Sequence, residues 1–292
     1  MSIFNGSGTA LITPFTDNGV NFEALKNLIE FQIANGTKAL VICGTTGEPP
    51  TMTADEKRQV MQFAIQTVNH RIPVICGTGG NCTANVIESS AYAEKIGADA
   101  ILAVTPYYNK CTQNGLIEYY KAISDNVTLP IIAYNVPSRT GVNILPETAA
   151  KLCGIKNLKA IKEASGNTEQ LKKLFEAVGN KLDIYSGDDK LNLKTLELGG
   201  AGVISVVSNI LPSAVSLICE EFFNGNLEKA AEMHNSLAEI TDALFIEVNP
   251  IPVKTALNIM GYNCGKLRAP LTEMEEEHKK ILITEMKNLK LI

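Results

Sequence analysis

The stretch GTALITPF, residues 8–15, helps most in choosing between two kinds of parallel α/β fold. Its apolar run is typical of a buried strand, and the run ends in Thr13-Pro14-Phe15. A doubly wound nucleotide-binding sheet typically has G-x-G-x-x-G after its first strand, and that motif is missing here. The cluster GTGGN at 77–81 resembles a phosphate loop only loosely, because no Walker lysine follows, so it indicates a tight strand-to-helix turn. Nucleotide binding therefore has little support.

Further apolar or β-branched runs follow the first at fairly even intervals. They are ALVICG (39–44), PVICGTG (73–79), AILAVTP (100–106), PIIAYNVP (130–137), LKAIKEAS (158–165), LDIYSGDD (182–189) and GVISVVS (202–208). Helical periodicity lies between them, as over 22–34 and 53–69, and typical N-cap residues precede several such segments: Asn21, Thr53, Thr112 and Asn167. Eight βα units within about 200 to 250 residues predict a closed (β/α)8 TIM barrel, with an open doubly wound sheet as the alternative.

Strand signals stop after Asn224-Gly225-Asn226. Helical patterns follow over 227–247, after the prolines at 250 and 252, and over about 272–289. We therefore predict two parts, a (β/α)8 catalytic barrel over residues 1–225 and a C-terminal helical appendage over 226–292.

The composition limits the classes of partner. The 292 residues carry a formal net charge of −5 without a basic stripe, which argues against nucleic acid and anionic membranes. No apolar run reaches the roughly 18 residues of a membrane span, and the N-terminus does not resemble a signal peptide, so we expect a cytoplasmic protein. The seven cysteines are scattered without C-x-x-C, which favours reduced, buried thiols, and the three histidines lack the spacing of a zinc site.

Polar motifs follow several of the predicted strands. In a (β/α)8 barrel, active groups project from the C-terminal strand ends. The motifs at those ends are GTTGE (44–48), TPYYN (105–109), YNVPSRTG (134–141), KEASG (162–166) and SGD (186–188). Each alone has an ordinary structural explanation, such as a turn or a rim aromatic. Their convergence on one rim favours a functional site.

Lys162 is unusual because it lies within a predicted buried strand, and lysines are rarely buried unless they are paired or used. Period-two alternation puts Leu158, Ala160, Lys162 and Ala164 on one face, which we expect to be the barrel lumen. A snorkelling side chain or a salt bridge to Glu163 is the simpler explanation. Because a poorly hydrated amine favours its uncharged, nucleophilic form, the alternative is a Schiff-base lysine that attacks a carbonyl carbon.

Two other groups would assist an imine at Lys162. Alternation along 130–137 points Tyr134 inward beside Lys162. A hydroxyl chain of Tyr134, Thr45 and a second tyrosine could move protons to and from the carbinolamine oxygen, help that is commonly worth about 100- to 10,000-fold. The backbone amides of Thr45 and Thr46, in a glycine-flanked turn, could hold a substrate carboxylate.

In their order and spacing, GTTGE, TPYYN, YNVPSRTG, IKEASGN and YSGDD resemble the dihydrodipicolinate synthases, also called 4-hydroxy-tetrahydrodipicolinate synthases, of the pyruvate-dependent class I aldolase and lyase superfamily. The resemblance spans the barrel and continues into the helical tail. It implies a lyase that condenses pyruvate with L-aspartate 4-semialdehyde to 4-hydroxy-tetrahydrodipicolinate, the committed step toward diaminopimelate and lysine. It also implies no organic cofactor or catalytic metal, since pyruvate is bound covalently as substrate, and a homotetramer built as a dimer of dimers.

The resemblance assigns four catalytic residues: Lys162, Tyr134, Thr45 and Tyr108. Lys162 matches the imine-forming lysine, and the other three match a proton relay in which Tyr108 comes from the neighbouring subunit. Four further residues match substrate contacts: Thr46, Arg139, Gly187 and Ile204. Thr46 would contact the pyruvate carboxylate and Arg139 the semialdehyde carboxylate, which a guanidinium can bind bidentately. Gly187 and Ile204 would line the pyruvate pocket through their backbones.

The chain departs from family members that are inhibited by lysine. Their lysine-binding positions correspond here to Pro49, Pro50, Ala54, Asn81, Asn85 and Tyr107. Asn81 and Tyr107 fit, but Ala54 and Asn85 lack the imidazole and carboxylate found in those members. We therefore expect weak or absent feedback inhibition by L-lysine.

Two alternatives remain at the level of sequence. Another pyruvate-dependent lyase, such as N-acetylneuraminate lyase or a keto-deoxy-sugar-acid aldolase, would share Lys162 and Tyr134. Arg139, Tyr108 and the double threonine of GTTGE favour a short carboxylated aldehyde over a long polyol. A catalytically silent barrel, used as a sensor or scaffold, would not need this whole set of residues.

Overall fold

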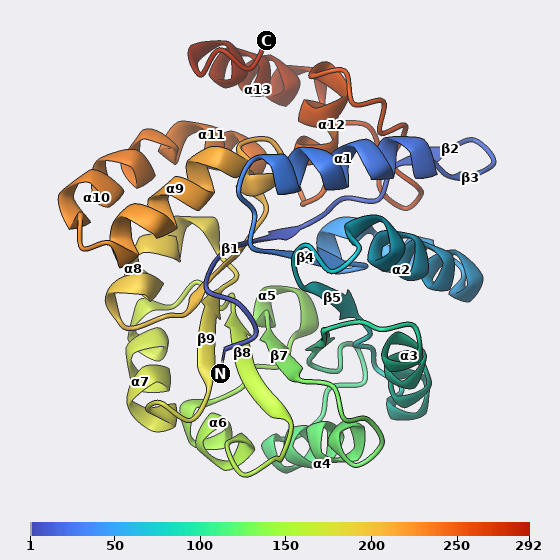
Figure 1. Ribbon diagram of the computed structural model, residues 1–292, viewed down its shortest axis with the longest axis vertical. Coiled ribbons are helices and arrows are strands. Elements are labelled where there is room, and N and C mark those ends of the chain that lie inside the picture. The colour runs from blue at the N-terminus through green and yellow to red at the C-terminus, as the bar shows by residue number, and fades with distance from the viewer. Residues whose placement is uncertain (1) are drawn as a thin grey trace. The chain divides into compact units, whose positions relative to one another are not determined.

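Strands and helices alternate along the computed structural model, which describes residues 2–292 (Figure 1). The barrel strands are β1 Gly6–Ala10, β4 Ala39–Ile42, β5 Val74–Gly77, β6 Ala100–Val104, β7 Ile131–Asn135, β8 Leu158–Glu163, β9 Asp183–Ser186 and β10 Gly202–Ser205. They form one closed barrel in the order β1, β10, β9, β8, β7, β6, β5, β4. The expected TIM barrel is confirmed, and each predicted strand run contains or overlaps one of these strands.

The described chain forms two compact units. The first comprises residues up to Gly6 together with Pro73–Ile204. Its helices are α3 Thr83–Lys95, α4 Gln113–Ser124, α5 Pro137–Thr140, α6 Pro146–Leu152, α7 Thr168–Val178 and α8 Asn192–Glu197, with a 3₁₀ turn, η3, at Asp189–Leu191. Strands β6 and β7 are buried along almost their whole length because they lie between the barrel interior and the outer helices.

The second unit comprises Ser7–Ile72 and Ser205–Ile292. Its helices are α1 Phe22–Ala34, α2 Ala54–Val68, α9 Pro212–Phe223, α10 Leu227–Ser236, α11 Ala238–Leu244, α12 Ile251–Ile259 and α13 Glu276–Asn288. Its 3₁₀ turns are η1 Thr45–Gly47, η2 Pro49–Thr51 and η4 Val207–Asn209, and a small hairpin pairs β2 Phe15–Thr16 with β3 Gly19–Val20.

The helix starts follow the capping residues read from the sequence. The side chains of Asn21, Thr53, Thr112 and Asn167 each accept a hydrogen bond from a backbone N–H in the first turn of the helix that follows. At α2 the Glu56 carboxylate also accepts from the Thr53 N–H, which completes a capping box. These helices therefore begin where local chemistry places them, and α1 occupies 22–34 as predicted.

The first strand is shorter than the sequence suggested. It ends at Ala10, and the N–H of Ile12 donates to the Asn209 side chain at 3.2 Å. Pro14 has no N–H with which to continue a ladder, so the chain turns into the β2–β3 hairpin. The loop GTGGN is confirmed as a strand-to-helix connection, and a Cβ at Gly79 would lie only 2.2 Å from the Val104 nitrogen.

The C-terminal region is helical, as predicted, but it is divided differently. The expected helix over 227–247 is two helices, α10 and α11, separated at Leu237. The last helix begins at Glu276 instead of near Thr272. Within the second unit, α10 packs on α9, and α13 packs on α11 and α12 (Figure 1). The division into a barrel over 1–225 and an appendage over 226–292 stays a prediction.

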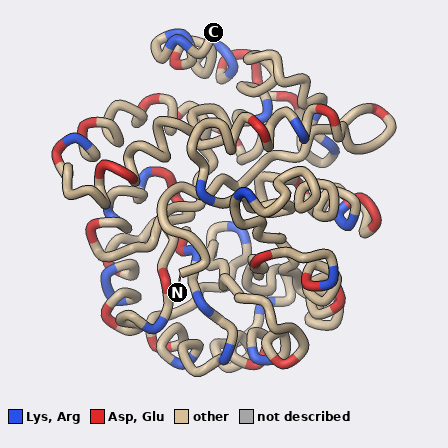
Figure 2. The backbone as a smooth tube through the Cα atoms, viewed as in Figure 1, with Lys and Arg blue, Asp and Glu red and all other residues tan. Residues whose placement is uncertain are grey.

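Surface charge and cysteines largely follow the composition. Acidic and basic residues both occur along helix α13 (Figure 2). All seven cysteines are free thiols; four are buried as expected, whereas Cys82 is exposed.

Among residues 2–292, no helix combines the length and apolar character that crossing a membrane requires.

Candidate active site

Lys162 lies buried in β8, and only 4% of its surface is exposed. The parallel pairing of β7 and β8 puts Tyr134 directly opposite it. The Lys162 Nζ lies 4.4 Å from the centre of the Tyr134 ring, and Tyr134 is buried too. From Ala160 onward β8 pairs regularly with β7, as the expected alternation requires. Leu158 precedes a register shift in the β7–β8 pairing, so its expected place on the Lys162 face is not supported by the regular ladder.

The simpler explanations for Lys162 do not fit the contacts. Glu163 points to other partners: its carboxylate accepts from the Asn135 Nδ2 at 2.9 Å and from the Ser165 N–H at 2.8 Å. Burial, partly offset by these hydrogen bonds, raises the pKa of Glu163. Within residues 2–292, no carboxylate forms an ion pair with the Lys162 amine. The amine is thus buried beside a phenol ring and has no anion to neutralise it.

Gly187, just after β9, makes room for the lysine side chain. A Cβ at this position would lie 2.7 Å from Lys162 Cε and 2.9 Å from Cγ. The Gly187 N–H donates to the Glu163 carbonyl at 2.7 Å, which fixes its backbone against β8. Ile204, in β10, is fully buried. A larger residue at 187 would therefore force the Lys162 side chain or the backbone to shift.

Tyr108 and Arg139 belong to two loops that touch each other. Tyr108, in the loop after β6, is 90% exposed and has a left-handed backbone with φ of 69°. Arg139 is exposed on the short helix α5 after β7. The Thr105 hydroxyl donates to the Thr140 hydroxyl at 3.0 Å, which ties one loop to the other. An exposed tyrosine in a strained backbone conformation is a candidate for a functional role, since it does not contribute to the packing of its own chain.

Thr45 and Thr46 form the first residues of the 3₁₀ turn η1 after β4. Thr46 is buried and Thr45 half-buried. Their N–H groups open the turn, where no earlier turn supplies an acceptor, so they can donate to an anion. The Thr46 Oγ1 accepts a hydrogen bond from the Asn249 Nδ2 at 3.0 Å.

Two groups of polar residues escaped the sequence analysis. In the first unit, the Asn135 Nδ2 also donates to the Asn143 Oδ1, which links the Glu163 carboxylate to the loop after α5. In the second unit, Lys254 forms a buried ion pair with Glu48 at 2.8 Å. Lys254 lies in the apolar run NPIPVKTAL, so the signal that singled out Lys162 would have found it.

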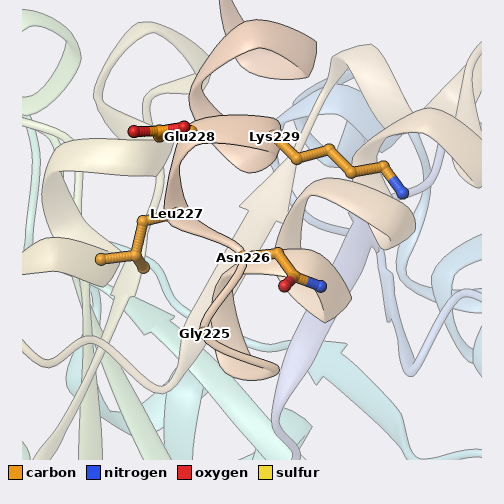
Figure 3. A pocket seen from close by; sticks show the side chains of 5 residues that line it. All are labelled: Gly225, Asn226, Leu227, Glu228 and Lys229. Atoms are coloured by element: carbon orange, nitrogen blue, oxygen red, sulfur yellow. The ribbon is translucent and has the colours of Figure 1, made fainter.

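A surface pocket elsewhere has none of this chemistry. It lies at the turn between α9 and α10 and is lined by residues 225–229 (Figure 3). Lys229, on its wall, is paired with Glu221 at 2.6 Å, and none of the predicted site residues reaches it. In the part of the chain that the structure describes, no cluster of histidine, cysteine, aspartate or glutamate has the makings of a metal site.

The fold and the candidate site are those of the (β/α)8 enzymes that work through a buried lysine amine. The model of the dihydrodipicolinate synthetase family matches residues 3–289, and the chain belongs to this family. The family resemblance and enzyme class expected from the five motifs are thereby confirmed.

Individual relatives agree over their whole length. The 4-hydroxy-tetrahydrodipicolinate synthase 1 of Clostridium acetobutylicum is 52% identical over 292 residues, which cover 100% of both chains. A chloride-inhibited dihydrodipicolinate synthase from Acinetobacter baumannii, solved in complex with pyruvate, is 42% identical with a TM-score of 0.97 over 99% of this chain and 100% of its own. A synthase variant described as monomeric is 44% identical, with a TM-score of 0.96 over 99% and 98%. These relatives are named as synthases, not as sialic acid or sugar-acid lyases.

Proposed function

We propose that the chain condenses pyruvate with L-aspartate 4-semialdehyde to 4-hydroxy-tetrahydrodipicolinate through a Schiff base on Lys162. The main support is the Lys162 amine, buried, next to the Tyr134 ring and without an ion-pair partner in the described chain. A lysine amine in such a place can attack a ketone carbon, whereas an ion pair would hold the amine in its charged, unreactive form. The reaction named for the relatives requires that nucleophile.

The first half of the reaction activates pyruvate. The Lys162 nitrogen attacks the ketone carbon, and the carbinolamine oxygen leaves as water after it gains a proton. We assign that proton transfer to the Tyr134 phenol, with Thr45 and Tyr108 completing the relay. The resulting iminium withdraws electrons, so the methyl group loses a proton and becomes a nucleophilic enamine. Pyruvate therefore serves as a covalently bound substrate, and the step uses no organic cofactor or metal.

The second half forms the new carbon–carbon bond. The enamine carbon attacks the aldehyde carbon of aspartate semialdehyde, and the aldehyde oxygen takes up a proton to become the hydroxyl. The amino group of the adduct then attacks the imine carbon and displaces the Lys162 amine, which is returned unchanged. Formation of the imine releases the one water that balances the reaction.

The remaining site residues bind the two carboxylates. We assign Thr46 and the amides of its turn to the pyruvate carboxylate, because a glycine-flanked 3₁₀ turn presents unpaired donors. We assign Arg139 to the semialdehyde carboxylate, because its guanidinium lies exposed on a loop tied to the Tyr108 loop. Gly187 and Ile204 would line the pyruvate pocket through their backbones.

Tyr108 would act in a second subunit. Its side chain is almost fully exposed and its backbone is strained, which fits a group that completes a neighbouring site. We propose a homo-oligomer, a dimer of dimers, in which the first interface is essential to activity. One solved synthase variant is described as monomeric, so the state of this chain must be measured by sedimentation.

The wider context follows from the reaction. We place the enzyme in the cytoplasm, at the committed step of diaminopimelate and lysine biosynthesis. We also keep the division into a catalytic barrel over 1–225 and a helical appendage over 226–292 as part of this proposal.

Borohydride reduction in the presence of pyruvate tests the central step. Mass spectrometry of peptides should find a lactyl-sized adduct, the 1-carboxyethyl group left by reduction of the imine, on Lys162 and none in a Lys162→Ala variant. Lys254 is an internal control, since it is equally buried but ion-paired with Glu48. Modification of other lysines with Lys162 unmodified would contradict the proposal. Comparing aspartate semialdehyde with sialic acid as substrates then separates this reaction from the other pyruvate lyases.

A further inference from the structure

The second unit contains a buried lysine that the proposed reaction does not use. Lys254, in α12, is 1% exposed, and its Nζ lies 2.8 Å from the Glu48 Oε1. Its amine also lies 4.1 Å from the centre of the Phe15 ring. Burial lowers the pKa of Lys254, and the Glu48 charge opposes this. The pair is therefore surrounded by protein on all sides, out of reach of a substrate.

A buried ion pair of this kind adds little to stability on its own. Removing two charges from water is expensive, and an apolar pair of the same volume is often as stable or more so. The main effect of the pair is therefore expected to be on the position of the chain segments that it joins. Arg268 adds two contacts to the Glu48–Lys254 pair. Its backbone N–H donates to the Glu48 Oε2 at 3.2 Å, and its guanidinium lies 3.9 Å from the Phe15 ring centre.

Glu48 ends the turn that contains Thr45 and Thr46. It has a left-handed backbone with φ of 57°, which a glutamate does not favour unless surrounding contacts impose it. Cys43, two residues before Thr45, is also left-handed with φ of 56°. The segment from Cys43 to Glu48 is thus strained at both ends, and the ion pair to α12 is a contact that can hold it there.

Helix α12 contacts this turn at a second point. Asn249, just before the helix, donates through Nδ2 to the Thr46 Oγ1 at 3.0 Å. Since the hydroxyl oxygen accepts from Asn249, the hydroxyl hydrogen must point elsewhere and remains available to an anion. Asn249 and Lys254 therefore contact the two ends of the segment Thr46–Glu48.

We propose that Glu48 and Lys254 are positioning residues, whose buried ion pair fixes the turn Thr45–Glu48 on helix α12 so that its donors meet the carboxylate of a 2-oxo acid. The inference rests on the proposed function and adds to it a role for the C-terminal helices in binding the first substrate. Asn249 has the same positioning role, since it orients the Thr46 hydroxyl.

The test uses the isosteric variants Glu48→Gln and Lys254→Met and the double variant. For each, two quantities are measured: the pyruvate concentration that gives half-maximal borohydride trapping, and stability in urea. Each single variant leaves one buried charge unpaired, so it should lose stability and raise the half-saturating pyruvate concentration about tenfold. The double variant should regain stability while the half-saturating concentration stays raised. Recovery of both quantities together would overturn the proposal, because it would show a merely structural role.

Two further variants keep the test sharp. Leu257→Ala weakens the packing of the same helix without removing a charge, since Leu257 is fully buried in α12. It should lose stability but leave half-saturation within about twofold; a rise as large as that of Lys254→Met would refute positioning by the pair. If the charge variants do not fold, Asn249→Ala decides, because it removes the hydrogen bond to the Thr46 Oγ1 without unpairing a charge and should still raise half-saturation several-fold.

The proposed function and the positioning role of the Glu48–Lys254 pair can be refuted separately. If the unmodified protein traps no pyruvate on Lys162, the proposed function fails and this inference with it. If the unmodified protein traps pyruvate and the variants show unchanged half-saturation, only the positioning role is overturned.

Discussion

The amine of Lys162 lies 4.4 Å from the centre of the Tyr134 ring, and the two residues face each other across the β7–β8 ladder. A charged amine over the face of an aromatic ring is attracted to it. The register of two strands thus sets the distance between the Lys162 amine and the Tyr134 ring.

Tyr134→Phe keeps the ring contact and removes only the phenol. Turnover should fall about 100-fold or more, because the carbinolamine oxygen loses its proton donor. Initial rates with both substrates measure this. The matched control is Tyr120→Phe, which removes the hydroxyl of another buried tyrosine that donates to the Ala103 carbonyl at 3.0 Å. The control should be destabilised by about 1 kcal/mol and keep its turnover; equal rates for the two variants would contradict the relay.

Gly187→Ala should displace the lysine. Its Cβ would lie 2.7 Å from Lys162 Cε, so either the strand or the side chain must move. Because a misplacement of about 1 Å can reduce catalysis about 100-fold, we expect a loss of that order while the circular dichroism spectrum stays unchanged. At Gly154 a Cβ would meet nothing closer than 3.4 Å, so Gly154→Ala is the control. Full activity in Gly187→Ala would show that the close packing of Gly187 does not fix the position of the Lys162 amine.

The fold was largely accessible from the sequence because its signals are local. Apolar runs marked the eight strands, and the side chains of Asn21 and Thr53 marked helix starts through hydrogen bonds within four residues. The division at Leu237 was missed, since neither proline nor glycine marks it. The first strand ends earlier than its apolar run, because the Ile12 N–H donates to the Asn209 side chain, distant in sequence, instead of to a neighbouring strand.

Only part of the candidate site could be predicted from the sequence, because only part of it is marked by local patterns. Lys162 and Tyr134 stood out as polar groups in apolar strands, and strand register then brought them together. The contact between Asn249 and Thr46 joins residues separated by about two hundred positions, so no local pattern could indicate it. The Glu48–Lys254 pair likewise depends on tertiary packing, although the buried lysine itself was visible in the sequence.

Tyr108 can be tested by mixing two variants, one with slowed turnover and one that is inactive. Tyr108→Phe should slow turnover about 100-fold and leave the fold intact, since its side chain is 90% exposed. Lys162→Ala should abolish turnover. If Tyr108 acts on the neighbouring subunit, refolding the two variants together creates sites that have both groups, and activity should return.

The mixture separates the two arrangements cleanly. If Tyr108 acts within its own chain, every hybrid site lacks one of the groups and the mixture stays inactive. Native mass spectrometry of the mixture, run beside the rate assay, verifies that hybrids have formed, because the two substitutions give the subunits different masses.

Inhibition by L-lysine should be weak. Ala54 and Asn85 are exposed and present neither an imidazole nor a carboxylate to a cationic amino acid. Initial rates at saturating pyruvate should therefore be unchanged in millimolar L-lysine. Introducing the missing groups by Ala54→His with Asn85→Glu is the matched comparison and should increase sensitivity. Strong inhibition of the unmodified enzyme by micromolar lysine would refute the prediction.

The ion pair between Glu56 and Arg268 should make stability depend on pH. The guanidinium donates to both carboxylate oxygens at 2.9 and 2.6 Å, and this lowers the pKa of Glu56 from 4.5 to about 2. Because the folded pKa lies below the unfolded one, the stabilisation is complete above about pH 4.5 and is lost as the pH falls toward 2. Solvent reaches both side chains, so we expect about 1 kcal/mol at pH 7.

Glu56→Gln removes the charge and one of the two acceptors of the Arg268 guanidinium, while its amide oxygen can still accept from the Thr53 N–H of the capping box. Urea unfolding from pH 7 to pH 3 should show the variant less stable at neutral pH and the difference shrinking below pH 4.5. Glu30→Gln, at the more exposed pair with Arg71, should give a smaller difference. A difference for Glu56→Gln that stays constant from pH 7 to pH 3 would assign the effect to lost packing, since the packing of the side chain does not titrate.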